Sequence, residues 1–234
     1  MSVLRVGTYN VCHGLGLDRR LDLQRTAAVL RRLDADVITV QEVDLGCRRS
    51  GGIDQAAELA RLTGMAWCFA PAIVFQGGLY GHLVLSRLPV LSWQAHALPG
   101  EEPRCVLAVD LNWDGQVIRF CGTHLDLDPG QRHLSLPILQ QVAERRGVPF
   151  VLAGDFNSTP DSAIIRHFAT VWQTGGSPDG QATYPADAPT AQIDHVLAGP
   201  AGCWRTLSTE VVADAVASDH RPVRVELALT GRPQ

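Results

Sequence analysis

Short apolar runs with strand character recur from residue 3 to residue 229, and only a few helical patterns separate them. Many strands mixed with few helices from end to end predict one α/β domain with a large mixed or double sheet. With 234 residues, the chain is long enough to bury a substantial core. No repeat, linker or low-complexity tract divides the sequence, so we expect a single domain over 1–234.

Four stretches have apolar residues at helical spacing. Asp22 is placed to cap the first at its N-terminus, and Gly64 stands at the C-cap of the second. Pro137 should interrupt or kink the third. The predicted helices cover 22–33, 54–64, 130–146 and 161–169.

The strand pattern is densest between 66 and 123, where turn residues separate short apolar runs. Within this interval, Asp114 and Gly115 predict a hairpin. The Gly-, Pro- and Asp-rich interval 173–191 predicts a surface loop. The other predicted strands cover 3–9 and 36–42, run into a loop over 148–157, and lie near 192–198, 203–211 and 223–229.

The charge pattern argues against long nucleic acids as the main partner. The net charge is −4, all 20 basic residues are arginine, and the arginine pairs are dispersed. A chain without a basic stripe is a poor candidate for tight, sequence-independent binding to DNA or RNA. Arginine does suit planar phosphates, so phosphate chemistry stays open and nucleic acid is a possible but not favoured partner.

The first residues lack the long apolar stretch of a signal peptide, and no apolar run approaches the roughly 18 residues that span a bilayer. We therefore expect a cytoplasmic protein without a transmembrane segment, and a monomer. The six cysteines form no C-x-x-C pair, which predicts reduced thiols instead of disulfides or a structural zinc site. They are Cys12, Cys47, Cys68, Cys105, Cys121 and Cys203.

Polar residues that could bind ligands or take part in catalysis lie where the predicted strands meet loops. A rigid sheet can hold such side chains at fixed separations. Any one of them alone is best read as a cap or turn former. Their repetition at so many strand ends favours a functional site. They are Asn10, Glu42, His124, Asp126, Asp155, Asn157, Asp194, His195, Asp219 and His220.

The side-chain types in this set are carboxylates, amides and imidazoles, with no thiolate. Hard oxygen ligands suit Mg²⁺ or Mn²⁺, which retain several waters and accept a phosphate substrate. A histidine-rich zinc motif, a G-x-S-x-G nucleophile elbow and a phosphate-binding P-loop are all absent from the sequence. The residues themselves thus point to metal-assisted phosphate chemistry.

Seven motifs in order resemble the endonuclease/exonuclease/phosphatase superfamily over nearly the whole chain. The resemblance implies a four-layer α/β sandwich of the DNase I-like type, with two packed mixed sheets flanked by helices. It also implies Mg²⁺- or Mn²⁺-dependent cleavage of a phosphoester by an activated water. The motifs are TYN (8–10), QEV (41–43), YGHLVLSRLP (80–89), THLD (123–126), GDFNSTP (154–160), QIDHV (192–196) and SDHRPV (218–223).

By this resemblance, Glu42 is the principal metal ligand, and Asn10 and Asp219 complete or flank the metal site. Asp155 matches the carboxylate that orients or deprotonates the attacking water. Asn157 matches the amide that holds this water and the phosphate.

The resemblance places His220 near the scissile phosphate, with Asp194 fixing its tautomer and supporting its positive charge. His124 matches a second histidine on the phosphate side, which stabilises negative charge or assists the leaving group. Arg104 and Tyr80 match weaker family positions that contact phosphate or shape the site.

Several residues depart from the family pattern. His82 stands where many relatives have asparagine. Cys12 stands where some DNA-repair members carry a carboxylate, so no second metal ligand is expected there. The motif that contains His124 lacks the tyrosine of abasic-site endonucleases, and the motif that contains Asn157 lacks the pattern of inositol-polyphosphate 5-phosphatases. His195 should point away from Asp194, because neighbouring residues of a strand face opposite sides.

The favoured hypothesis is a divalent-metal-dependent phosphoesterase that acts on a phosphodiester or phosphomonoester, with a small or lipid-like substrate slightly preferred. A DNA or RNA nuclease of the same fold is the alternative within enzymes. A catalytically silent binding module is disfavoured, because every principal site residue of the family is present. The sequence names neither the physiological substrate nor the number of metal ions.

Overall fold

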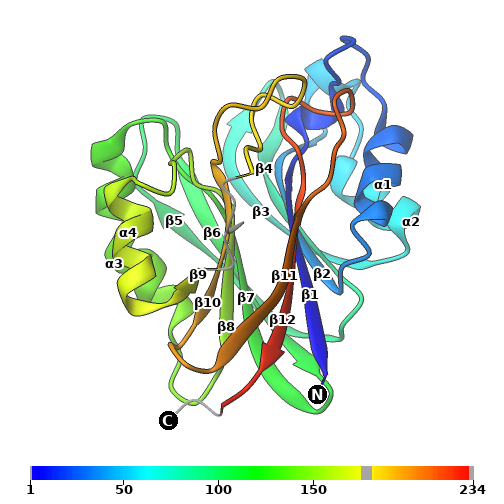
Figure 1. The fold of residues 1–234 in the computed structure, drawn as a ribbon. Helices are drawn as coiled ribbons and strands as arrows, with labels where there is room; N and C mark the ends of the chain where they lie inside the picture. Colours follow the sequence, from blue (N-terminus) through cyan, green and yellow to red (C-terminus); the bar gives the residue numbers. More distant parts are fainter. Residues whose placement is uncertain (1, 175–180, 232–234) are drawn as a thin grey trace.

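Two six-stranded β-sheets pack face to face in the computed structural model, which describes residues 2–174 and 181–231 (Figure 1). The first sheet has the order β11 (Trp204–Val211), β12 (Val223–Leu229), β1 (Val3–Asn10), β2 (Val37–Leu45), β4 (Gly78–Ser86) and β3 (Ala66–Phe75). The second has the order β5 (Val90–Leu98), β6 (Arg104–Trp113), β7 (Gln116–His124), β8 (Phe150–Asp155), β10 (Asp194–Gly199) and β9 (Gln173–Thr174).

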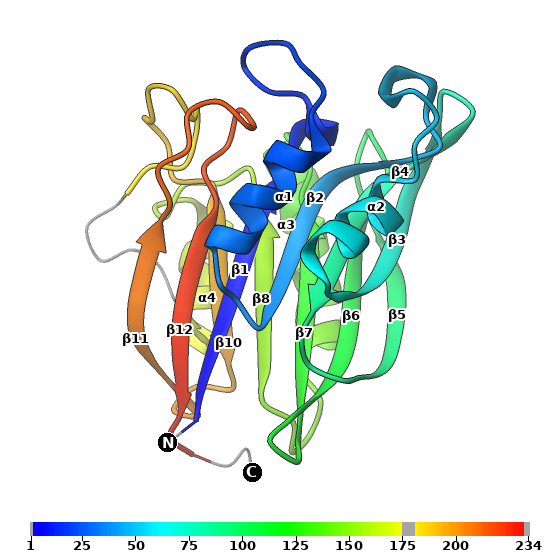
Figure 2. The same ribbon diagram turned by 90° about the vertical axis from the view of Figure 1, so that its right-hand side faces the viewer.

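Helices cover the outer face of each sheet, so the arrangement has the four layers that the family resemblance implies. α1 (Leu23–Arg32) and α2 (Gln55–Thr63) lie on the first sheet, and α3 (Pro129–Ala143) and α4 (Ala163–Val171) lie on the second (Figures 1 and 2). None of the helices in the described part of the chain is long and apolar enough to cross a membrane.

The predicted helix caps are confirmed. The side chain of Asp22 accepts a hydrogen bond from the backbone N of Arg25 and so satisfies one of the free donors of the first turn of α1. Gly64 adopts the left-handed conformation after α2, with φ of 71°.

Three apolar layers hold the fold together. The central layer lies between the two sheets and contains Leu4, Val109 and Phe120. One outer layer packs α1 and α2 against the first sheet around Leu30, and the other packs α3 and α4 against the second around Phe168. Because both sheets are covered on both faces, their central strands are apolar almost throughout, as the sequence pattern predicts.

Two parallel strand pairs decide where loops gather. β1 runs parallel to β2, and β7 runs parallel to β8. The carboxyl ends of these strands therefore meet at the same end of the molecule, which is the upper end in Figure 1. The segments before β10 and β12 also lie at this end, since both strands run antiparallel to their neighbours β8 and β1.

The predicted end of β2 is wrong, and of the interruption or kink predicted at Pro137 the interruption does not occur. β2 does not stop at Glu42 but continues to Leu45, with a register shift between Val40 and Val43 that marks a bulge. α3 continues through Pro137 without interruption. Its buried residues, such as Leu139, pack against the second sheet, and this contact outweighs the one backbone hydrogen bond that proline removes.

The hairpin prediction is confirmed, and the loop prediction is confirmed for most of the described residues. Asp114 and Gly115 join β6 to β7 with positive φ values of 51° and 82°, as a type I′ hairpin turn requires. Most described residues of 173–191 form a loop, but Gln173 and Thr174 pair with β10 as β9. Residues 175–180 of this predicted loop lie outside the described residues.

The two sheets approach each other closely at Gly122 of β7, two residues before the end of this strand at His124. A methyl group at this position would lie 2.2 Å from Oγ1 of Thr39 on β2. Thr39 also accepts a hydrogen bond from the amide of Gln41, 3.1 Å away, so it is not free to move aside. The distance between the sheets at this point thus depends on the absence of a side chain.

We predict that Gly122→Ala lowers the free energy of unfolding by about 1–3 kcal/mol, the usual effect of overpacking a core. Urea denaturation followed by circular dichroism would measure it. Adding Thr39→Ala to the same chain removes the nearest atom and should recover part of the loss relative to Thr39→Ala alone. Equal losses from Gly122→Ala in both backgrounds would contradict this account.

Candidate active site

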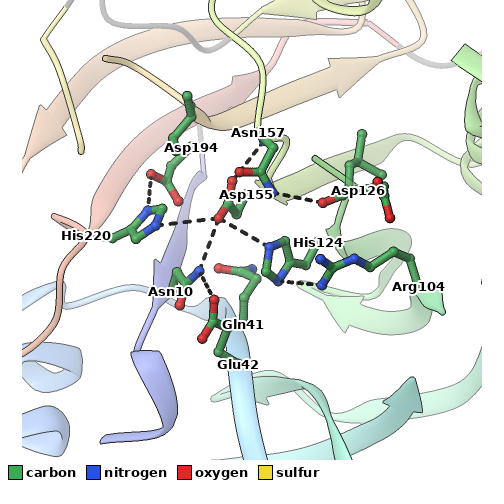
Figure 3. A network of polar contacts seen from close by, with 12 residues as sticks. Asn10, Gln41, Glu42, Arg104, His124, Asp126, Asp155, Asn157, Asp194 and His220 are labelled. Carbon is green, nitrogen blue, oxygen red and sulfur yellow. Dashed lines mark hydrogen bonds and ion pairs between the residues drawn. The ribbon is translucent and has the colours of Figure 1, made fainter. Parts of the chain in front are cut away.

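Three of the predicted site residues form one row across the second sheet. His124 at the end of β7 pairs in register with Asp155 at the end of β8, and Asp155 pairs with Asp194 at the start of β10. Residues paired on neighbouring strands point to the same face of a sheet. Asn10, at the end of β1, approaches this row from the first sheet (Figure 3).

Asp155 lies at the centre of the site and is only 1% exposed. Its Oδ2 accepts a hydrogen bond from Nδ2 of Asn10 at 3.1 Å. The same oxygen lies 3.5 Å from Nε2 of His124 and 3.6 Å from Nε2 of His220. Its Oδ1 accepts from the backbone N of Asn157 at 2.9 Å. Elements from both sheets therefore converge on one carboxylate.

The charge state of Asp155 is set by burial and by its neighbours. Desolvation is the main cause that raises its pKa, the carboxylate of Asp194 raises it further, and His220 lowers it, with a result of about 7. In the metal-free protein, this carboxyl group thus exchanges a proton near neutral pH. That is the range in which a general base is most effective.

The predicted contact between Asp194 and His220 is confirmed: Nδ1 of His220 lies 2.9 Å from Oδ2 of Asp194. Burial lowers the pKa of His220, but the charge and hydrogen bond of Asp194, with Asp155 and Asp219, raise it to about 10. His220 is therefore an imidazolium at neutral pH. Its Nδ1–H donates to Asp194, and its Nε2–H faces Asp155.

Asn157 follows β8 in a left-handed backbone conformation, with φ of 47°. Asparagine tolerates this conformation better than most residues. Its Nδ2 donates to the backbone O of Leu125 at 2.9 Å, so the amide side chain is anchored to the loop after β7. This anchor holds the amide beside Asp155.

His124 differs from His220 in charge. Burial, and then the guanidinium of Arg104, lower the pKa of His124 well below its ordinary value, so the ring is neutral. Arg104 can only donate, so its contact of 3.5 Å with Nδ1 of His124 assigns the ring proton to Nε2. This Nε2–H points toward Asp155.

Arg104 and Tyr80 lie beside the row and not within it. They line a small pocket together with His82 and His124. Arg104 is 9% exposed and forms an ion pair with Glu102 at 2.9 Å. Burial lowers the pKa of His82 to about 4, so the residue that departs from the family pattern adds no positive charge to this pocket.

Glu42 lies on the first-sheet side of the site, at the bulge of β2. It has a φ of 60° and accepts a hydrogen bond from Nδ2 of Asn10 at 3.0 Å. Burial is the main cause that raises the pKa of Glu42, and the nearby carboxylate of Asp219 raises it further. The amide group of Asn10 thus donates to both Glu42 and Asp155.

The side chains around Glu42 are of the types that bind a divalent cation. Among the described residues, neither Glu42 nor Asp219 lies within ion-pair distance of an arginine. The charges of His220 and Arg49 lower the pKa of Glu42 only in part, and a cation between the two carboxylates would neutralise them more fully. Asn10 adds an amide oxygen, which also accepts from the backbone N of Cys12 at 3.1 Å. This donor set is the kind that Mg²⁺ and Mn²⁺ prefer.

A second group of ligand atoms is less suited to a metal. Asp155, Asp194 and His220 offer ligand atoms within 4.8 Å of one another, all buried. This cluster could bind a metal only if His220 released its proton, because a protonated imidazole has no lone pair to donate. The ion pair with Asp194 opposes that release.

The side chains of His195 and Asp126 make structural contacts. The Nε2 of His195 lies 2.7 Å from the backbone O of Ser158, and its ring packs edge-on against Phe156. The prediction that it faces away from Asp194 is consistent with these contacts. Asp126 accepts a hydrogen bond from the backbone N of Asp128 and so stabilises its own loop.

Tyr184, in the predicted surface loop 173–191, is not among the predicted site residues but lies at the site. The ring of Tyr184 lies 4.9 Å from the ring of His220, centroid to centroid. The loop is held there because the backbone N of Ala186 donates to O of Asp219, and the backbone N of Arg221 donates to O of Thr183. An aromatic ring beside an imidazolium stabilises its charge. The available signal in the sequence was the pair Tyr184 and Pro185, which comes shortly before the motif that contains Asp194.

Comparison with known proteins identifies relatives of the same architecture. Residues 7–220 match the Endonuclease/Exonuclease/phosphatase family. A solved endonuclease/exonuclease/phosphatase from Beutenbergia cavernae DSM 12333 is 26% identical, with a TM-score of 0.81 over 99% of this chain and 72% of that one. One from Bacteroides vulgatus is 18% identical, with a TM-score of 0.80 over 98% and 100%. A mannosyl-6-phosphatase from Bacteroides thetaiotaomicron VPI-5482 is 17% identical, with a TM-score of 0.74 over 97% and 100%.

We predict that Asp194→Asn lowers the pKa of His220 in the metal-free protein from about 10, because the charge and hydrogen bond that oppose burial most strongly are lost while Asp155 and Asp219 remain. Histidine side-chain NMR across a pH titration would measure this. Asp161→Asn, which removes a surface carboxylate, is the matched control and should leave the pKa of His220 unchanged.

The same pair predicts a pH dependence of stability. A folded-state pKa above the unfolded value stabilises the fold fully below pH 6.5, and the contribution disappears as the pH rises through about 10. The difference in unfolding free energy between wild type and Asp194→Asn should therefore shrink over this interval. A difference that grows with pH would refute the assigned charge of His220.

Proposed function

This chain belongs to the endonuclease/exonuclease/phosphatase family, and on that premise we propose that it hydrolyses a phosphoester with a water molecule activated at Asp155. Members of the family are hydrolases that act on phosphoesters. The observation that carries the proposal is the position of Asp155, a buried carboxyl with a pKa of about 7 between a charged and a neutral imidazole.

In this proposal, Asp155 accepts the proton of the attacking water. Asn157 orients the same water. Its Nδ2 donates to the backbone O of Leu125 in the loop after β7, and this hydrogen bond holds the amide beside Asp155. Asn10 keeps the Oδ2 of Asp155 aimed into the site by a hydrogen bond from the first sheet. A water aimed in this way supplies the nucleophile of phosphoester hydrolysis.

The phosphate group is assigned to the side of the two histidines. His220 presents a positive charge that Asp194 maintains, and this charge stabilises the non-bridging oxygens as negative charge develops. His124 donates from Nε2 as a neutral ring. Arg104, behind His124, adds a second positive charge, and Tyr80 shapes the adjoining pocket.

Glu42, Asp219 and Asn10 are proposed to hold the divalent metal, Mg²⁺ or Mn²⁺. When bound, the metal neutralises charge on the phosphate and on the departing oxygen. Glu42 and Asp219 supply the negative charge for this site, and Asn10 fixes Glu42 in place. The bulge in β2 serves the site directly, because it gives Glu42 its backbone conformation.

For the substrate, we favour a phosphodiester with a small or lipid-like body. Large apolar side chains are exposed on loops that flank site residues: Leu127 is 73% exposed just after the motif of His124, and Val216 is 45% exposed just before Asp219. The backbone N of Leu17, which is also exposed, donates to the O of Val216, so these two lie together. Apolar loops suit an amphipathic substrate better than a polyanion.

A substrate panel tests the proposal. Bis-p-nitrophenyl phosphate, p-nitrophenyl phosphate, plasmid DNA and vesicles with sphingomyelin or a phosphoinositide would be assayed with Mg²⁺, Mn²⁺, Ca²⁺ or EDTA. We expect turnover of a phosphodiester with Mg²⁺ or Mn²⁺ and none with EDTA. Activity that EDTA leaves unchanged would overturn the metal assignment. Preferred cleavage of plasmid DNA would replace the lipid-like substrate with the nuclease alternative.

We predict that His220→Ala lowers kcat by at least about 10²-fold, the usual effect of losing a positioned charge-stabilising or acid–base group. Steady-state kinetics on the best substrate of the panel would measure it. His133→Ala, which removes an exposed histidine of α3, is the control. A near-normal kcat in the folded His220 variant would remove that residue from the mechanism.

We predict that Glu42→Gln weakens Mg²⁺ or Mn²⁺ binding, because the amide replaces the charged ligand. Isothermal titration calorimetry on the metal-free protein would show the change. Glu58→Gln makes the same substitution at an exposed ion pair and should bind metal as wild type does. Equal affinities in the two variants would exclude Glu42 as a ligand.

A further inference from the structure

A second set of possible metal ligands meets at Glu42. The Sγ of Cys12, a ring nitrogen of His13 and a carboxylate oxygen of Glu42 all lie within 4.8 Å of one another. All three residues are half-buried, so the cluster opens toward solvent. From the sequence, no second metal ligand is expected at Cys12. The cluster arises because the turn after β1 folds back against the bulge of β2.

The backbone holds this cluster in an unusual conformation. Cys12, His13 and Glu42 have positive φ values of 43°, 45° and 60°, which residues other than glycine rarely adopt. Gln55 connects the two segments: its Nε2 donates to the backbone O of His13 at 2.7 Å, and its Oε1 accepts from the backbone N of Asp44 at 3.0 Å. The ligand atoms are therefore held together before any ion binds.

Two side chains of the cluster lack the environment that a purely structural role would give them. The Nδ1 of His13 is buried and has no hydrogen-bond partner among the described residues. Buried polar atoms normally have a partner, so this nitrogen is free to accept a ligand. Cys12 is also set apart, because the other five cysteines of the chain are buried.

The chemistry of the three ligands differs from that of the oxygen site beside it. Thiolate, imidazole and carboxylate together suit Zn²⁺ or Co²⁺, whereas Mg²⁺ takes oxygen ligands. Metal–ligand distances of about 2.0–2.3 Å place tetrahedral ligand atoms roughly 3.3–3.8 Å apart, so small side-chain rotations suffice here. Three protein ligands leave the fourth position for a water or a phosphate oxygen.

We propose that Cys12, His13 and Glu42 form a site for zinc or a zinc-like ion, which shares Glu42 with the oxygen-rich site for Mg²⁺ or Mn²⁺. On binding, the thiol of Cys12 releases its proton to solvent, and the thiolate bonds to the metal. That Glu42 is shared rests on the proposed function, whereas the binding of zinc by the three residues does not.

Cobalt spectroscopy tests the site without relying on activity. Co²⁺ added to the metal-free protein should give a thiolate-to-cobalt charge-transfer band in the near ultraviolet that saturates at one ion per chain. Zn²⁺ should abolish this band by displacement. Absence of the band in the folded wild-type protein would overturn the proposal, whatever the result of the substrate panel.

Matched variants assign the ligands. Cys12→Ser should abolish the cobalt band, whereas Cys47→Ser, at a buried thiol that donates to the backbone O of Leu79, should retain it. His13→Gln should keep the band but weaken Co²⁺ affinity at least about tenfold. Circular dichroism verifies that each variant is folded. A band that persists in Cys12→Ser, or an unchanged affinity in His13→Gln, would contradict the site.

Discussion

The hydrogen bond from Asn10 to Asp155 is the contact on which the arrangement of the site depends. It joins the end of β1 to the end of β8, across 145 residues of sequence and across the space between the two sheets. Because the same amide group also donates to Glu42, one side chain sets the position of the proposed base relative to the proposed metal ligand. The close packing at Gly122 keeps the sheets near enough for this contact.

The buried carboxylates make the site electrostatically unfavourable by itself. Asp155 and Asp194 are both nearly fully buried, and the carboxylate of Asp194 raises the pKa of Asp155. The proton of His220 offsets part of this cost, and a cation between Glu42 and Asp219 would offset more. Such a cluster persists because three apolar layers stabilise the surrounding fold. The excess negative charge of these carboxylates favours binding of a cation and of the anionic groups that the cation attracts.

Much of the fold followed from local patterns in the sequence. The caps at Asp22 and Gly64 and the hairpin at Asp114 depend on residues next to one another in the chain, and all three are confirmed. The bulge at Glu42 was not predictable, because an apolar run with a polar residue after it looks the same whether the strand ends or bends. Tyr184 was missed because its loop is held by hydrogen bonds to a distant segment, such as the one from Nε of Arg221 to the O of Ala186, 35 residues away.

The sequence by itself determined the kinds of groups available: carboxylates, amides and imidazoles where strands meet loops, in the order of one family. The family resemblance already paired Asp194 with His220, but the tertiary structure decided the contacts of Asp155 and Tyr184 and the charges that burial sets. Asp194 meets His220 because β10 lies beside β8 in one sheet and β12 lies beside β1 in the other. Periodicity is a property of chain neighbours, whereas a pKa depends on burial and on charges that only the packing of the two sheets brings together.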